Sequence, residues 1–196
     1  LLHFVKVNPH IKFIIAPHEI SAARLADVKA AFTDSVFYSE LVKKEGIENA
    51  SLYSVNPQGP AQGALGAGGQ ISSPHVLIID NMGMLSRLYQ YAAVTYVGGG
   101  FGADGVHNVL EAAVYGKPVV FGPEYVKFNE AVELLRAGGA VSVDGPVSLE
   151  KVLHKLLTDD EARKNTGDAA RQFVLKNGGA TRAIMQFIQE KRLLTN

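Results

Sequence analysis

Residues 94–124 read VTYVGGGFGADGVHNVLEAAVYGKPVVFGPE, and the fold prediction rests on this stretch. A short apolar run, VTYV, enters a turn with five glycines in the eight residues 98–105. A segment of helical character follows from about His107 to Tyr115, and a second apolar run, PVVF, comes after it. A strand, a tight turn, a helix and another strand in this order are typical of a βαβ unit with parallel strands.

The rest of the chain repeats this alternation. Apolar runs predict strands at 12–16, near Ser35 and Ala50, and at 75–80, 94–98, 118–122 and 140–144. Helical spacing predicts helices at 19–32, 83–92, 107–115 and 128–138, with further helices at 148–157, 160–177 and 181–194. Strands that are apolar throughout and alternate with helices indicate a mostly parallel sheet covered on both faces. The sequence therefore predicts an α/β, doubly wound, Rossmann-like fold with extra C-terminal helices.

Composition narrows the classes of function. The 196 residues carry 19 basic and 19 acidic side chains, so no global charge attracts nucleic acid or a membrane surface. There is no cysteine, which excludes disulfides and thiolate metal sites. Residues 56–74, NPQGPAQGALGAGGQISSP, are too polar to bury a core, and we expect a flexible surface loop there. The first residues, LLHFVKVNPHIKFIIA, resemble the middle of a protein whose apolar segment leads straight into a strand.

The candidate site lies in the loops that follow the strands. In open parallel sheets, ligands bind beside the carboxyl ends of the strands. Four polar or glycine-rich loops are expected there, at 17–19, 80–83, 98–108 and 122–127. The glycines of the third loop allow a ligand to approach the backbone closely, and the N–H groups of the next helix favour a phosphate.

A dinucleotide site is one interpretation of this loop. Gly100, Gly102 and Gly105 have the G-x-G-x-x-G spacing, and Glu124 follows about 20 residues later, as in NAD-binding domains. The spacing is a weak indication here, because the motif follows a strand in the middle of the chain and polar residues come directly after it.

His107, Asn108 and Glu111 share one face of the expected helix. Asn108 has two interpretations, a helix cap or a ligand contact. Glu111 lies in an otherwise apolar helix, where a carboxylate needs partners, and the two hydroxyls of a ribose are suitable donors. His107 is equally suited to binding a donor carboxylate and to supporting the turn. His75 and His154 are expected to be structural or surface residues.

The glycine turn followed by HNVLEAAVYGKPVVFGP resembles the donor-nucleotide half of GT-B glycosyltransferases, and more narrowly the 3-deoxy-D-manno-octulosonic acid (Kdo) transferases of lipopolysaccharide synthesis. The resemblance spans about residues 12–135. That family shows VGGS, GGHNxLEP, GxPVxxGP and NFxE. The matching residues are Val97, Gly98, Gly99, Gly105, His107, Asn108, Leu110, Glu111, Gly116, Pro118, Val119, Gly122, Pro123, Phe128 and Glu130. A second motif, D-x-M-G-x-L, is matched by Asp80, Met82, Gly83 and Leu85, and P-R-H-P-E is partly matched by Pro17, His18 and Glu19.

The resemblance implies CMP-Kdo as the donor substrate, with no metal or other cofactor, and a lipid A precursor as the acceptor. It implies that Glu111 binds the ribose hydroxyls and that Asn108 and the turn of Gly98, Gly99 and Gly100 lie by the phosphate. It also implies that the backbone of Met82 and Gly83 holds the nucleotide. Pro17, His18 and Glu19 would flank the cytosine or the phosphate, and His107, Lys127 and Glu130 complete the expected donor-binding set.

The sequence departs from the family pattern at three positions. The arginine expected after Pro17 is absent, Lys127 stands where the family usually has Asn, and Gly100 stands where it usually has Ser. His18 and Lys127 are the two candidates to replace the missing cation.

The resemblance also predicts how the chain fits into an enzyme. Residues 1–196 would be a single nucleotide-sugar-binding domain, itself soluble and inactive alone. The acceptor-binding domain, with the catalytic base, would belong to the rest of a protein at the cytoplasmic face of the bacterial inner membrane. No catalytic residue is assigned within the chain. In GT-B enzymes the last helix often crosses to the other domain, so the apolar face of 185–194 is expected either to be exposed or to pack on its own sheet.

Two alternatives remain open at this point. One is an NAD(P)-binding domain of an oxidoreductase, and the other is a non-catalytic nucleotide-binding module. No nucleic-acid partner is expected, because the chain has no net charge.

Overall fold

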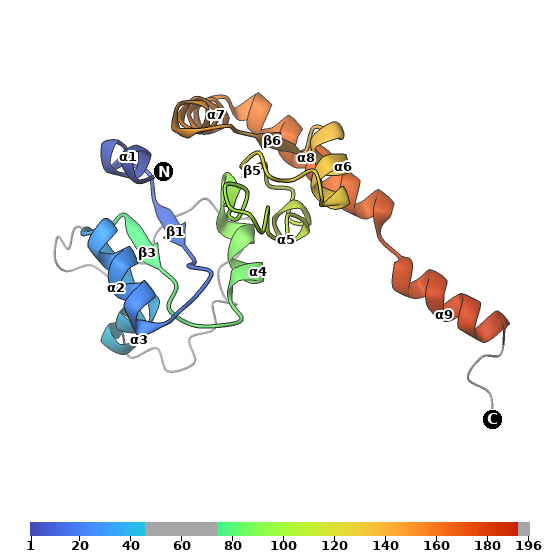
Figure 1. Cartoon of the computed structure of the whole chain (residues 1–196), viewed down its shortest axis with the longest axis horizontal. Helices are drawn as coiled ribbons and strands as arrows, with labels where there is room; N and C mark the ends of the chain where they lie inside the picture. Colours follow the sequence, from blue (N-terminus) through green and yellow to red (C-terminus); the bar gives the residue numbers. More distant parts are fainter. Residues whose placement is uncertain (46–73, 192–196) are drawn as a thin grey trace. The chain divides into compact units, whose positions relative to one another are not determined.

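The computed structural model describes residues 1–45 and 74–191 (Figure 1). Contacts divide the chain into two compact units, Leu1–Gly83 and Met84–Asn196, and each is described by itself. The prediction of one domain over 1–196 stays a prediction. The strand expected near Ala50 and the loop expected at 56–74, except for Pro74, lie outside the described residues.

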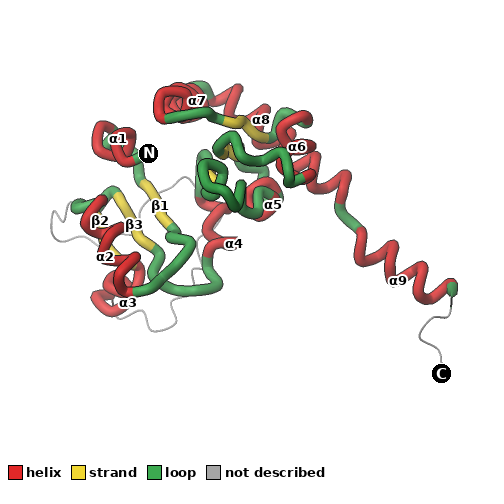
Figure 2. The backbone as a smooth tube through the Cα atoms, viewed as in Figure 1, coloured by secondary structure: helices red, strands yellow, loops and turns green. Residues whose placement is uncertain are grey.

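The first unit is built around a three-stranded parallel sheet. Its order is β1–β3–β2, with β1 at Phe13–Ile15, β2 at Ser35–Phe37 and β3 at Val76–Ile78 (Figure 2). Helices α1 (Leu2–Val7), α2 (Ala22–Ala31) and α3 (Tyr38–Glu45) accompany it. The core centres on three buried residues, Val5, Val76 and Ile78. All three strands lie where the apolar runs predict them.

Two expectations for this unit were wrong. The first residues form a helix, α1, before the strand, since Phe4 and Val5 turn into the core and the Asn8 side chain binds the Phe4 carbonyl at 2.8 Å. The apolar run SVFYS at 35–39, predicted as the strand near Ser35, forms a strand only as far as Phe37. A new helix begins there because the Glu40 carboxylate accepts a hydrogen bond from the Phe37 N–H at 3.1 Å, as a helix cap does.

The second unit repeats the parallel arrangement. Its sheet has the order β4–β5–β6, with strands at Thr95–Val97, Val119–Phe121 and Ala140–Ser142. Figure 1 shows the helices that belong to this unit. They are α4 (Leu85–Leu88), the 3₁₀ helix η2 (Tyr89–Tyr91), α5 (Leu110–Ala113), α6 (Asn129–Arg136), α7 (Pro146–Thr158), α8 (Asp160–Asn177) and α9 (Ala180–Glu190). Side chains from α5, α6 and α8 share one core with the strands. The predicted α/β, Rossmann-like architecture is confirmed.

Helix α5 is shorter than expected. It covers Leu110–Ala113 instead of 107–115. At its start, the His107 N–H binds the Gly98 carbonyl at 3.0 Å and therefore belongs to the turn. After its end, Gly116 adopts φ +66°. Helix α8 packs closely against Gly116, because a Cβ at Gly167 would collide with the Gly116 carbonyl oxygen.

Helix α9 exposes its apolar side chains within the part of the chain that the structure describes. Phe187 is 54% exposed and Ile184 is 59% exposed. Of the two expectations for the apolar face at 185–194, exposure therefore holds for the described residues up to 191. Among the described helices, none combines the length and the apolar character that crossing a membrane requires.

Candidate nucleotide site

The turn after β4 is held by its own backbone. The Gly102 N–H donates to the Gly99 carbonyl at 2.8 Å, and the Gly105 N–H donates to the Gly102 carbonyl at 3.1 Å. Gly99 and Gly105 have φ values of +87° and +80°. A side chain at either position would be strained, and a Cβ at Gly99 would also lie 2.6 Å from the His107 ring. The glycines therefore build a defined turn.

The turn after β4 is joined to the loop after β5. Glu124 donates its backbone N–H to the Gly100 carbonyl at 2.9 Å and accepts the Val106 N–H at 2.9 Å. The two loops also touch directly, because a Cβ at Gly100 would lie 2.7 Å from the Gly122 nitrogen. Glu124 thus holds this edge of the sheet together through its main chain, while its side chain is exposed.

Three consecutive backbone donors of this turn have no acceptor in the part of the chain that the structure describes. The N–H groups of Gly99, Gly100 and Phe101 make no hydrogen bond within residues 1–45 and 74–191. Gly100 is buried, and a buried N–H without an acceptor is costly unless water or a ligand supplies one. Successive N–H groups in a glycine turn are suited to the oxygens of a phosphate.

Asn108 and Glu111 meet as their spacing predicts. The Asn108 amide nitrogen donates to Glu111 Oε1 at 3.1 Å, and its Oδ1 accepts the Leu110 N–H at 3.0 Å. Asn108 therefore caps the start of α5 and orients the carboxylate at the same time. Burial raises the pKa of Tyr89, and the nearby Glu111 carboxylate raises it further. Glu111 is partly buried, with one oxygen held by Asn108.

The other predicted residues of this unit surround the joined loops. His107 supports the turn through its backbone and lies against Gly99, while a contact with a donor carboxylate stays a prediction. Lys127 is exposed in the turn before α6, and Glu130 is exposed in the first turn of that helix. Neither side chain has a hydrogen bond or ion pair among the described residues.

Five predicted residues belong to the first unit. Pro17, His18 and Glu19 follow β1, with Pro17 partly buried and the other two exposed. Met82 and Gly83 follow β3 in a turn where Met82 is 80% exposed and Gly83 has φ +86°. Each group thus lies in a loop that leaves the carboxyl end of a strand, as expected.

One contact beside these loops was not predicted from the sequence. Asp80 binds Ser39, which opens α3, through both of its carboxylate oxygens. The only signal in the sequence was the match of Asp80 to the D-x-M-G motif, since nothing local relates it to Ser39.

Of the two histidines expected to be structural or surface residues, His154 is exposed. The His75 side chain is largely buried, and its Nε2 has no hydrogen-bond partner among the described residues. His75 Nδ1 lies 2.7 Å from the Asp34 carboxylate at the start of β3. Within the described ranges, no group of three His, Asp or Glu side chains is arranged to hold a metal ion.

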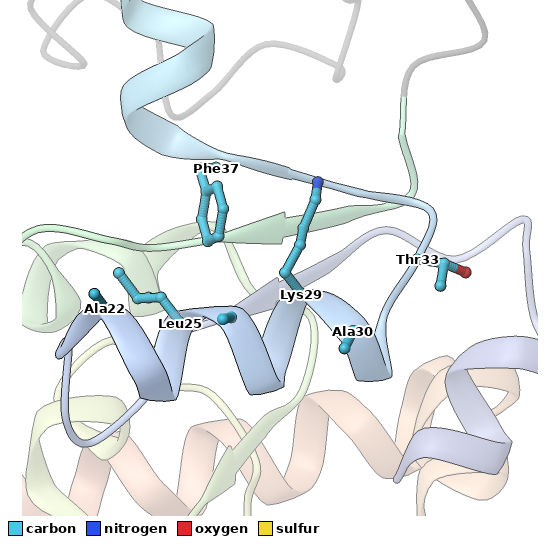
Figure 3. Close-up of a pocket in the computed structure, with 7 residues that line it drawn as sticks. Ala22, Leu25, Lys29, Ala30, Thr33 and Phe37 are labelled. Carbon is cyan, nitrogen blue, oxygen red and sulfur yellow. The ribbon is translucent and has the colours of Figure 1, made fainter.

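Two hollows among the described residues lie away from the predicted residues. The larger, about 730 Å³, is an apolar surface hollow along α2, where Leu25, Lys29 and Phe37 are among the lining residues (Figure 3). The smaller, about 380 Å³, is polar and includes Lys117, whose pKa is lowered by burial. Neither contains a predicted donor residue, so the site rests on the turn geometry described above.

Known proteins support the resemblance seen in the motifs. The 3-deoxy-D-manno-octulosonic acid transferase of Bordetella pertussis is 33% identical over 128 residues, which cover 63% of this chain and 30% of that protein. The Haemophilus influenzae enzyme of the same name is 28% identical over 116 residues, 58% of this chain and 27% of the relative. The chain is related to the Kdo transferases. The resemblance indicated by the motifs is thereby confirmed.

A solved structure supports the fold independently. The C-terminal CMP-Kdo binding domain of WaaA from Acinetobacter baumannii aligns with a TM-score of 0.63, covering 88% of this chain and 78% of that one. The two are 19% identical, so this likeness concerns the fold. No family model matches the chain. The chain spans about a third or less of the length of the Kdo transferases that it matches.

Proposed function

We propose that the chain is the donor-binding part of a Kdo transferase and that it binds CMP-Kdo. The observation that carries the proposal is the turn after β4. It presents the N–H groups of Gly99, Gly100 and Phe101, which have no acceptor among the described residues, and the helix that follows it carries a partly buried carboxylate at Glu111. A nucleotide sugar offers the matching groups, phosphate oxygens for the N–H groups and ribose hydroxyls for the carboxylate. The relatives named Kdo transferases support this donor over others.

Glu111 is the residue that we assign to the ribose. One of its oxygens accepts from Asn108, which fixes the orientation of the carboxylate and leaves acceptor capacity on both oxygens. Asn108 is committed to Glu111 and to the Leu110 N–H, so it acts beside the phosphate chiefly by holding the turn. Within the first unit, taken by itself, we assign nucleotide contacts to the backbone of Met82 and Gly83 and to the loop of Pro17, His18 and Glu19.

In the proposed transfer of Kdo, the main role of this part of the protein is to stabilise charge. Transfer of Kdo breaks the bond between the sugar and the phosphate, and negative charge develops on the CMP that leaves. The N–H groups of the turn that have no acceptor among the described residues would stabilise that charge without a metal ion. Lys127 of the second unit and His18 of the first unit are the candidates to supply a positive charge. The acceptor hydroxyl must lose a proton. We propose that a carboxylate in another domain accepts this proton and that a lipid A precursor at the inner membrane is the acceptor.

The geometry disfavours the NAD alternative. In a dinucleotide fold the last glycine of the motif lets the following helix pack closely on the strand, but here α5 begins five residues after Gly105. The space beside Gly105 is filled by the Phe128 ring and the Glu124 carbonyl. Glu124, which would bind the ribose of NAD, contributes its main chain to the joined loops.

Calorimetric titration of the chain with CMP and with NADH tests the proposal. We expect weak, saturable binding of CMP, no binding of NADH, and no transfer of Kdo by the chain alone. Glu124→Ala is the matched control, because it removes an exposed carboxylate and keeps the backbone bonds. Binding of NADH without binding of CMP at millimolar nucleotide would overturn the proposal.

A further inference from the structure

The Asp80 side chain holds the base of the turn that carries Met82 and Gly83, and it takes no part in the nucleotide contacts assigned above. Asp80 follows β3, the middle strand of its sheet. Its Oδ1 accepts the backbone N–H of Ser39 at 3.0 Å, and its Oδ2 accepts the Ser39 hydroxyl at 2.5 Å. Both bonds are partly buried, and hydrogen bonds to a carboxylate are about twice as strong as neutral ones.

Asp80 thereby joins two loops at the carboxyl edge of the sheet. Ser39 lies in the first turn of α3, directly after β2, so the bonds link the exit of β3 to the exit of β2. On the other side, the Ile79 N–H donates to the Ile15 carbonyl at 2.9 Å and ties the same exit to β1. The chain leaving β3 is therefore held by both neighbouring strands up to Asp80.

Beyond Asp80 the turn projects outward. Met82 is 80% exposed, and a Cβ built on Gly83 would meet no described atom within 4 Å. The position of such a turn relative to the sheet depends on where its first residue is anchored. An anchor at Asp80 sets the position of the Met82 and Gly83 backbone three residues later.

We propose that Asp80 is a positioning residue for the donor nucleotide, acting through Ser39 to hold the Met82–Gly83 turn. The proposal rests on the proposed function, since it concerns the nucleotide contact assigned to that turn. A carboxylate suits the role because it accepts from the hydroxyl and from the N–H of Ser39 at once. It also lies at the N-terminal end of α3, where negative charge is favourable. Asn keeps one acceptor oxygen for the Ser39 N–H, whereas Ala keeps none.

CMP titrations of the chain and five variants test this role. We expect Asp80→Ala to weaken CMP binding about 10-fold, and Asp80→Asn and Ser39→Ala to weaken it roughly 3-fold, in line with loss of one or two charge-assisted bonds. Asp80→Ala combined with Ser39→Ala should be no worse than Asp80→Ala alone. Ser21→Ala is the matched control, because the Ser21 hydroxyl caps α2 in the same unit without touching this turn.

Backbone amide NMR separates this inference from the proposed function. If the wild-type chain binds CMP and the Gly83 amide shifts on binding, the proposed contact stands. The inference then predicts a smaller Gly83 shift in Ser39→Ala and an unchanged one in Ser21→Ala. Wild-type affinity in both Asp80→Ala and Ser39→Ala would overturn the inference alone, as would an equal loss in Ser21→Ala. Failure of the wild-type chain to bind CMP would overturn the proposed function and the inference with it.

Discussion

Replacing Gly100 with Ala tests how closely the two loops of the second unit meet. The new Cβ would lie 2.7 Å from the Gly122 nitrogen and 2.9 Å from its Cα, whereas carbon atoms in good contact are about 3.5–4.0 Å apart. Both neighbours are backbone atoms, so the loops must separate by roughly 0.5–1 Å. Overpacking of this kind costs about 1–3 kcal/mol. Loss of the Glu124–Gly100 hydrogen bond adds about 0.5–1.5 kcal/mol.

We therefore expect Gly100→Ala to destabilise the second unit by about 1.5–4.5 kcal/mol. Urea denaturation followed by circular dichroism measures the loss, and hydrogen exchange at the Glu124 amide locates it. Gly102→Ala is the matched control in the same turn, because its Cβ would meet only the Gly99 carbonyl at an ordinary 3.5 Å. Equal stability of the two variants, or unchanged exchange at Glu124, would refute the reasoning. Gly100→Ser should behave like Gly100→Ala, so the serine of the Kdo-transferase pattern does not fit this geometry.

Three further predictions concern neighbouring residues. Glu111→Ala should weaken CMP binding by about 1–3 kcal/mol in calorimetry, with Asn108→Ala weaker in effect, and an unchanged affinity in Glu111→Ala would contradict the ribose assignment. Tyr89 should ionise above the normal tyrosine range in an ultraviolet pH titration, and Glu111→Gln should lower its pKa only in part because burial is the larger cause. A Tyr89 pKa in the normal tyrosine range would contradict its burial beside Glu111. Gly167→Ala should lower the melting temperature, since its Cβ would strike the Gly116 carbonyl, and a wild-type melting temperature would show that α8 adjusts freely.

The fold followed from the sequence because its strands are short, apolar and regularly spaced. Every strand predicted within the described residues is present, since a strand buried on both faces needs apolar side chains throughout. Helices α1 and α3 were missed for a shared reason. Their ends depend on side-chain caps such as Glu40 and on burial of Phe4, and hydrophobic spacing does not reveal either.

The site was predictable where its residues are close in sequence. Asn108 and Glu111 are three residues apart, so helical spacing alone brings them together. The bond of Glu124 to Gly100 joins loops from two strands through backbone atoms, which no residue type indicates. The Ser39–Asp80 contact spans 41 positions and depends on β2 and β3 being neighbours, which the sequence pattern left open.

Amide NMR of the chain during a CMP titration tests the central claim most directly, because it reports on each backbone donor separately. We predict that the amides of Gly99, Gly100 and Phe101 shift together and saturate with a single dissociation constant. The amide of Val147, an exposed residue of α7, is the control and should not move. Binding of CMP that leaves these three amides unshifted would contradict the claim that this turn holds the donor phosphate.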